Sequence, residues 1–290
     1  MIGQIIVLTL VKGGLYALLA SGLALIYGVG RIINLAHTAF FMIAGYGLFY
    51  FTQSLGWGLP ESIAVTVVGI GLLGVLVYRF LLNRIREHQA TVLLMTIALG
   101  MVFQHLMLLS FGSIPRTLPV LIGGTTEILG FKIFNYQLLT VGVVAVVITV
   151  VWLILTKTKM GISIRAVAND AEIANLMGIS VSRTLMITMG IGTALAGVAA
   201  ILSTSGGSVF YLMWLPPLMM VLVIVVLGGL GSFKGSFVGA FIIALVEAVV
   251  LTLNPTHGYL SQVFALAAMV IVLVVRPGGL FGTIFEEEKL

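Results

Sequence analysis

Apolar runs about as long as a membrane helix recur along the whole chain, and this pattern restricts the fold more than any other feature of the sequence. A helix needs roughly 20 mostly apolar residues to cross the hydrocarbon core of a bilayer. The runs lie near residues 5–27, 39–54, 61–83, 91–112, 136–156, 184–203, 215–230, 236–253 and 259–275. The sequence therefore predicts an all-α, polytopic membrane protein with a bundle of about 8–9 transmembrane helices.

The composition excludes an ordinary soluble fold. Hydrophobic residues make up 60% of the chain and charged residues 8%, whereas about a quarter of the residues of a soluble domain are charged. We expect one transmembrane domain over residues 1–290, with the first run retained as a span rather than removed as a signal peptide. The absence of cysteine excludes disulfides and thiolate metal sites, and the histidines lack the spacing of metal ligands.

The basic residues are divided unequally between the two sides of the predicted bundle. One alternating set of connections holds most of them, and the other holds only Arg116 and Lys132. The rich set comprises Arg31, Arg79, Arg84, Arg86, Lys157, Lys159, Arg165, Arg183, Lys234, Arg276 and Lys289. Because cytoplasmic loops carry an excess of Lys and Arg, we expect this side in the cytoplasm, with the N-terminus outside and the C-terminus inside for nine spans. The same bias explains the pI of about 9.6 without a nucleic-acid partner.

Glycine is frequent inside the apolar runs, as in GIGTALAG at residues 190–197. Small residues let helix backbones approach closely in lipid, so we expect a tightly packed bundle. Two Gly-rich stretches also break the helical pattern, YGVGRIINLAHTAFFMIAG at residues 27–45 and LGGLGSFKGSFVGAFIIA at residues 227–244. Both follow a span that runs inward, which suggests a parallel internal repeat.

The external loop over about residues 113–135 contains two β-favouring pieces, TTEIL and FKIFN. Pro and Gly precede them, so the pattern predicts a small hairpin on the external surface. The loop is interpreted either as a solvated connection or as a contact for an external binding partner.

The cytoplasmic connection over about residues 157–183 is a polar island between apolar runs. Asp170 is a favourable N-cap residue and Gly178 a favourable residue just past a helix end. Together they predict a short helix over AEIANLM, residues 171–177.

This short helix has one apolar face, because Ile173, Leu176 and Met177 share a side by the i, i+3, i+4 rule. A helix of two turns is marginal alone, so something must hold it. It lacks the aromatic residues of an interfacial lipid anchor. We therefore favour docking of the apolar face into a groove on another protein over a lipid anchor.

Few polar side chains fall at membrane depth, and such residues are candidates for function. Asn34 and His37 lie in INLAH beside a Gly-rich break, where non-helical backbone must be covered by protein or line a cavity. They are our candidates for the translocation path. Glu247, inside the run FIIALVEAVVLTL, either lines that path or pairs with a basic or hydroxyl group. Gln104 and His105 fit hydrogen bonds between helices.

A nucleotide-binding loop is absent from the sequence. The stretch GGLGSFKGS has neither the spacing of G-x-x-x-x-G-K-[ST] nor the Ser or Thr after the lysine. A transporter built on this chain must therefore take its energy from a partner protein or from an ion gradient.

Several stretches resemble the branched-chain amino acid class of ABC-transporter permeases, in the same order and over nearly the full chain. The first is MGISIRAVANDAEIANLMGI, with Arg165 before Ala166 and with Ala174 four residues before Gly178–Ile179. The others are INLAH after Tyr27–Gly28, VLGGLGSFKGSFVGA at residues 226–240, Glu247–Ala248, and RPGGLFG at residues 276–282. The chain is similar to the shorter of the two paired permease types.

The resemblance implies an importer subunit in the plasma (inner) membrane of a bacterium or archaeon. It implies a related second permease, an extracytoplasmic substrate-binding protein, and one or two cytoplasmic ATP-binding subunits that dock on the polar island. No cofactor, metal or catalytic residue is implied. The residues that would couple to the ATPase are Arg165, Asp170, Ile173, Ala174, Leu176, Met177, Gly178 and Ile179.

Two alternatives remain open at the level of sequence. Related permeases carry urea or short amides, so the cargo is one open question. The other alternative is an ion-coupled secondary transporter or channel that acts alone and uses Glu247.

Overall fold

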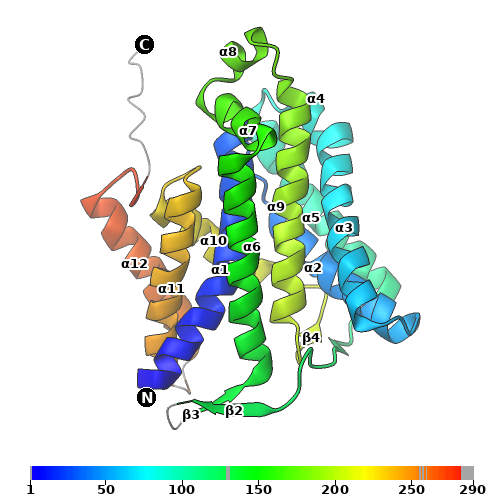
Figure 1. The fold of residues 1–290 in the computed structure, drawn as a ribbon, viewed down its shortest axis with the longest axis vertical. Coiled ribbons are helices and arrows are strands. Elements are labelled where there is room, and N and C mark those ends of the chain that lie inside the picture. The colour runs from blue at the N-terminus through cyan, green and yellow to red at the C-terminus, as the bar shows by residue number, and fades with distance from the viewer. Residues whose placement is uncertain (1, 129–130, 255, 257, 259, 282–290) are drawn as a thin grey trace.

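The computed structural model describes residues 2–281, apart from 129–130, 255, 257 and 259. Within this part of the chain, long helices run roughly along one axis and short elements cap the two ends (Figure 1). The helices are α1 (Ile2–Gly30), α2 (His37–Phe49), α3 (Leu59–Val77), α4 (Asn83–Ile85), α5 (Gln89–Phe111), α6 (Asn135–Lys157), α7 (Lys159–Asn169), α8 (Ala171–Leu176), α9 (Val181–Ser203), α10 (Leu215–Gly228), α11 (Phe233–Leu253) and α12 (Leu260–Val275). Two π-helical segments, η1 (Tyr50–Ser54) and η2 (Tyr78–Leu82), continue α2 and α3.

Six helices among the described residues are long and apolar enough to cross a membrane. They are α1, Leu59–Ile85 (α3 with η2 and α4), α5, α6, α9 and α11. The helices α10 and α12 are apolar but shorter, and α2 with η1 covers residues 37–54. Each predicted run corresponds to one of these segments, so the predicted all-α polytopic bundle is confirmed.

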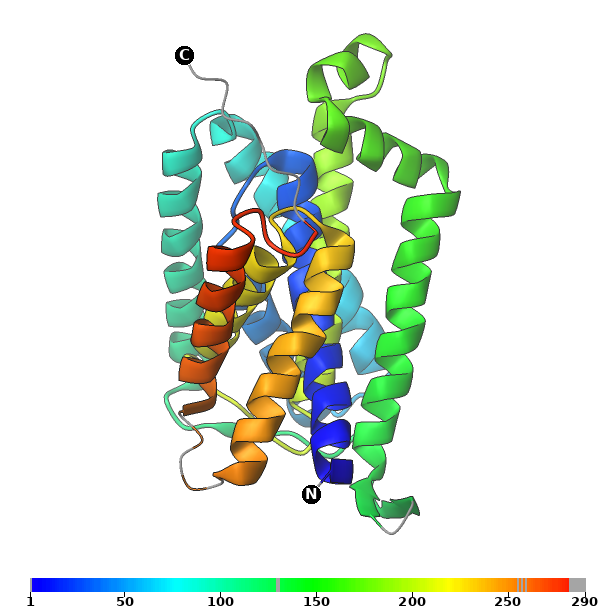
Figure 2. The ribbon, with the colours of Figure 1, turned by 90° about the vertical axis from the view of Figure 1, so that its left-hand side faces the viewer.

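The helix α1 lies at the centre of the bundle and packs against α6, α9, α10 and α11 (Figure 2). Its contact with α9 depends on paired glycines. A Cβ atom on Gly22 would lie 2.8 Å from the carbonyl oxygen of Gly192, and one on Gly192 would lie 2.9 Å from that of Gly22. The two backbones therefore touch without side chains between them, as the small-residue pattern predicts.

The chain turns back into the bundle after α1. Residues 31–34 have no regular structure, and Arg31 adopts the left-handed backbone region with φ 53°, which is uncommon for a residue with a Cβ. The next helix, α2, begins at His37, whose Nε2 lies 3.1 Å from the carbonyl oxygen of Leu19. Leu19 precedes Gly30 by about 16 Å of helix, so α2 starts inside the bundle rather than at its end.

The two Gly-rich breaks lie against each other. A Cβ atom on Gly28 would lie 2.7 Å from the carbonyl oxygen of Gly231. One break joins α1 to α2, and the other joins α10 to α11. The breaks thus meet at one end of the bundle, the end that carries α7 and α8 (Figure 1).

The opposite end carries the predicted hairpin. The strands β2 (Thr125–Ile128) and β3 (Phe131–Phe134) pair antiparallel, with Thr126 opposite Ile133. A second pair, β1 (Arg116–Thr117) with β4 (Ser208–Val209), joins this loop to the segment after α9. This second pair was not predicted, because its strands are two residues long and 92 residues apart.

Candidate functional site

The polar island forms two helices at one end of the molecule, α7 and α8 (Figure 1). The sequence predicts only the second. The first, α7, is capped by Thr158, whose hydroxyl accepts a hydrogen bond from the backbone N–H of Gly161 at 3.1 Å. It buries Gly161, Ile164 and Val167 on one face, and Arg165 donates a hydrogen bond to the carbonyl oxygen of Leu155. The coupling candidate Arg165 therefore ties α7 to the last turn of α6.

The short helix α8 is held by both of its ends, as predicted. The Asp170 carboxylate accepts hydrogen bonds from the backbone N–H groups of Glu172 and Ile173, both at 2.9 Å. At the other end the N–H of Gly178 bonds to Asn175 O and the N–H of Ile179 to Ala174 O, each at 3.0 Å. With φ +84° at Gly178 this is a Schellman motif, which favours glycine at that position.

The spacing of Ala174, Gly178 and Ile179 thus has a structural explanation, because these residues close the helix. Ala174 is buried, and Ile179 packs against the core. The predicted apolar face points the other way: Ile173 is 59% exposed, Leu176 83% and Met177 79%. The structure therefore presents a capped, exposed apolar face at the tip of the molecule.

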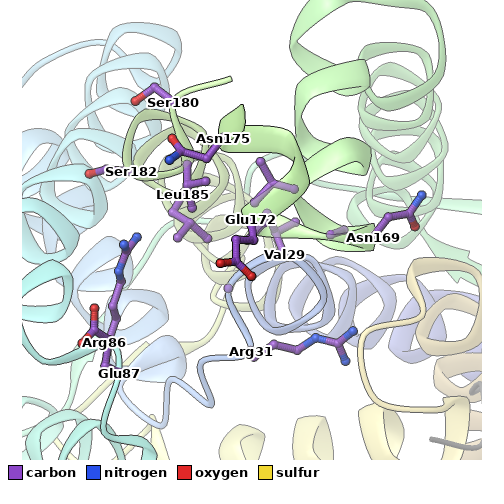
Figure 3. A pocket seen from close by; sticks show the side chains of 15 residues that line it. Val29, Arg31, Arg86, Glu87, Asn169, Glu172, Asn175, Ser180, Ser182 and Leu185 are labelled. Atoms are coloured by element: carbon purple, nitrogen blue, oxygen red, sulfur yellow. The ribbon is translucent and has the colours of Figure 1, made fainter. Parts of the chain in front are cut away.

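A pocket of about 620 Å³ lies at the base of α8 (Figure 3). Its lining comes from the end of α1, from the turn between α4 and α5, from α7 and α8, and from the start of α9. Four charged side chains line it: Arg31, Arg86, Glu87 and Glu172. We call it the charge-lined pocket; sequence reasoning missed it because its walls come from four separate stretches.

The path candidates Asn34 and His37 lie fully buried where α2 begins. The Asn34 carboxamide oxygen accepts from the backbone N–H of Ala36 at 3.1 Å, and its Nδ2 lies 3.7 Å from the sulfur of Met189 in α9. Among the described residues, His37 Nδ1 and the hydroxyls of Ser21 and Thr38 are buried without a hydrogen-bond partner. Buried polar groups are nearly always paired in proteins, so these groups make the interior around α2 unusual.

The third candidate, Glu247, lies in a different contact, between α11 and α1. Its Oε2 accepts hydrogen bonds from Lys12 Nζ and Tyr16 OH, each at 3.1 Å. Glu247 is 2% exposed, so its carboxylate is enclosed by the protein. The pairing interpretation of Glu247 thus has the basic and hydroxyl partners that it requires.

The contacts of Gln104, His105 and Lys12 show what sequence reasoning found and what it missed. The indole of Trp214, the residue just before α10, donates to the Gln104 carboxamide oxygen at 2.8 Å, so Gln104 links α5 to the start of α10. His105 instead bonds to Met101 O in its own helix. Lys12 was missed, although a basic residue inside the first apolar run is a signal that could have found the partner of Glu247.

Comparison with known proteins places these features in a family. Residues 5–273 match the family described as branched-chain amino acid transport system / permease component. LivH of Escherichia coli (strain K12), described as a high-affinity branched-chain amino acid transport system permease protein, is 29% identical over 290 residues, which cover 93% of this chain and 92% of LivH. BraD of Pseudomonas aeruginosa, described in the same words, is 27% identical over 288 residues, covering 94% and 93%.

A solved structure shares the fold. It is described as PsaBC from Streptococcus pneumoniae in complex with Fab. The similarity has a TM-score of 0.51 at 13% identity and covers 93% of this chain and 91% of that one. At this identity the likeness concerns the arrangement of the helices alone.

Proposed function

This chain belongs to the branched-chain amino acid ABC-transporter permease family, and from that premise we propose that it is the membrane-spanning subunit of an importer for branched-chain or similar small amino acids. Residues 1–290 then form one permease domain. The family match supports amino acids over urea or short amides as the cargo, because the relatives are described as branched-chain amino acid permeases.

The energy for import comes, in this proposal, from an ATP-binding subunit that docks on α8. The observation that carries the proposal is the exposed face of Ile173, Leu176 and Met177 on a helix capped at both ends. An amphipathic helix of this kind binds by laying its apolar face in a groove of its partner. Asp170, Ala174, Gly178 and Ile179 preserve the shape of α8, and Arg165 anchors α7, so that movement of the ATPase is passed to the bundle.

The basic residues at the α7–α8 end indicate how the protein is oriented in the membrane. Arg31 and Arg86 line the pocket at the base of α8, and Arg165 belongs to α7; an excess of basic residues is typical of the cytoplasmic side. The start of α1 lies at the hairpin end (Figure 1). We therefore propose that α7 and α8 are cytoplasmic and that the N-terminus is outside. The predicted cytoplasmic C-terminus falls in residues 282–290, outside the described residues.

The external end would receive cargo from a substrate-binding protein. The β2–β3 hairpin and the β1–β4 pair form the surface at that end. A related second permease would cover part of the exposed apolar helix faces within the bilayer. Inside the bundle, the buried polar groups at Asn34 and His37 are our proposed part of the path, whereas Glu247 holds α11 against α1.

The test is reconstitution of the full transporter, with its second permease, ATPase and binding protein, in proteoliposomes. We expect ATP-dependent uptake of leucine by the wild type. Leu176→Asp places a charge in the docking face and should abolish uptake while the protein stays in the membrane. The matched control is Ile162→Asp, an exposed isoleucine on α7 that lies outside this face.

Three results would contradict parts of the proposal. Uptake by Leu176→Asp at the wild-type rate would remove α8 as the docking element. Uptake without any ATPase, driven by an ion gradient and lost in Glu247→Gln, would show an ion-coupled transporter instead. Competition by urea or acetamide, without competition by valine or isoleucine, would overturn the proposed cargo.

A further inference from the structure

A groove runs between α6 and α11, and we call it the α6–α11 groove. It consists of two adjoining pockets of about 430 and 270 Å³, which share Ile148, Thr149 and Phe237. The smaller pocket has α1 as its floor, through Leu10 and Gly14. Figure 2 shows α6 on the right, α11 in the middle and, in the lower half of the view, α1 between them. Since all three helices are long and apolar enough to cross a membrane, we expect the groove to open into the bilayer.

The groove is apolar along its length. Phe237 and Phe241 line it from α11, and Val144 and Ile148 line it from α6. The hydroxyl of Thr149 donates to the carbonyl oxygen of Ala145 in its own helix at 2.7 Å, so it offers little to a ligand. The lining therefore fits a hydrocarbon chain and not a polar solute.

The one charged side chain among the described residues of the lining is Lys234. It is exposed, and within the part of the chain that the structure describes it has no hydrogen bond or ion pair. Lys234 is the second residue of α11, so its charge adds to the positive end of the helix dipole. This combination is unfavourable unless an anion lies nearby.

Lys234 and Trp152 mark the level of the lipid headgroups. Both line the larger pocket, from α11 and α6 respectively. The start of α11 follows the Gly-rich break that meets Gly28 at the α7–α8 end of the bundle. Trp152 is 46% exposed, and tryptophan is enriched where a membrane protein passes the boundary between hydrocarbon and headgroups. The positive charge thus lies at the end of the groove where the phosphate groups of one leaflet are found.

We propose that the α6–α11 groove binds an anionic phospholipid of the leaflet at the α7–α8 end, which is the cytoplasmic leaflet in the orientation proposed above. The phosphate group lies at the Lys234 ammonium group, and one acyl chain lies along the groove between Phe237 and Ile148. Basic pockets between transmembrane helices on the cytoplasmic side are typical sites for anionic lipid headgroups. A second permease fits less well, because it would have to place an acidic side chain in an apolar interface to pair with Lys234. The bilayer itself supplies the anion.

Photolabelling tests the site directly. The full transporter complex is placed in phosphatidylcholine nanodiscs that contain a trace of phosphatidylglycerol with a diazirine on one acyl chain. After irradiation, mass spectrometry of peptides measures the probe attached to residues 141–152 and 233–241. We expect labelling of both stretches, and about fivefold less labelling by a phosphatidylcholine probe with the same chain, because one lysine near a membrane surface favours an anionic lipid by about that factor.

Variants separate the charge from the groove. Lys234→Gln should lower labelling by the phosphatidylglycerol probe about fivefold, to the level of the phosphatidylcholine probe. Thr149→Trp places a large side chain in the wall that both pockets share and should lower labelling of residues 233–241 by both probes. The matched controls should leave labelling unchanged. Lys159→Gln removes the same charge at the start of α7, and Val150→Trp adds the same side chain at a neighbouring position, 47% exposed, outside the groove.

Three results would overturn the lipid site. The first is equal labelling by the two probes, or wild-type labelling of Lys234→Gln. The second is stronger labelling when Glu286, Glu287 and Glu288 are all replaced by glutamine, which would show that these acidic residues pair with Lys234 instead. The third uses the absence of cysteine from the chain: a benzophenone attached to the thiol of Thr149→Cys would cross-link to the second permease if the groove were a subunit interface.

The labelling result does not depend on the cargo or on import. If the phosphatidylglycerol probe labels the groove as expected but no amino acid is imported, the importer proposal fails and the lipid site stands. If leucine is imported but the two probes label equally, the lipid site fails and the importer stands.

Discussion

The contact between Glu247 and Lys12 permits a quantitative prediction about how α11 is held against α1. Glu247 Oε2 accepts hydrogen bonds from Lys12 Nζ and Tyr16 OH, each at 3.1 Å. Breaking a fully buried ion pair by removing one partner costs about 3–5 kcal/mol. The side chain of Lys12 is 33% exposed, so the protein encloses this pair only in part. We predict that Lys12→Met lowers the free energy of unfolding by about 2–3 kcal/mol.

The substitution Glu247→Gln should cost less. The carboxamide oxygen of glutamine can still accept from Lys12 and Tyr16, so both hydrogen bonds are kept and only the charge of Glu247 is lost. We expect a loss of about 1 kcal/mol for this change. In the double variant the two losses should not add, and the coupling energy should be about 1–2 kcal/mol.

The assay is reversible unfolding of the purified protein in mixed micelles by a titration with dodecyl sulfate, followed by far-ultraviolet circular dichroism. Lys132→Met in the external hairpin is the control and should change stability by less than about 0.5 kcal/mol, because Lys132 is exposed. Additive losses in the double variant would refute the pairing argument. If Glu247→Gln kept full stability yet abolished transport, Glu247 would belong to the path.

Three further substitutions test the caps and the packing. Asp170→Ala removes the N-cap of α8, so it should lower ATP-coupled uptake and cost about 1 kcal/mol of local stability. Asp170→Asn keeps a hydrogen-bond acceptor and should keep most of the uptake. Uptake in proteoliposomes is measured for both variants. Gly178→Val should reduce uptake more strongly than Gly178→Asn, because valine rarely adopts φ +84° and asparagine tolerates it; equal uptake by the two variants would contradict the Schellman assignment. Gly22→Leu should prevent assembly of the folded bundle, because its side chain would meet Gly192 O, and trypsin sensitivity of the membrane-inserted chain reports this loss.

Much of the fold could be predicted because the signals are local. Each apolar run corresponds to a helical segment, since backbone groups in lipid must be paired within the segment itself. The helix α8 was predicted for the same reason, because its caps at Asp170 and Gly178 depend on neighbouring residues only. The helix α7 was missed, since its stability comes from burying Ile164 and Val167 against other parts of the chain.

The sequence by itself determined that this protein is a bundle of membrane helices with a charged end and a short capped helix. Hydropathy, loop charge and capping are properties of neighbouring residues. Only the tertiary structure decided which distant side chains meet. Glu247 and Lys12 lie 235 residues apart, and the charge-lined pocket combines α1, the turn before α5, α8 and α9. Helix packing in three dimensions sets these contacts, and no spacing along the chain encodes them.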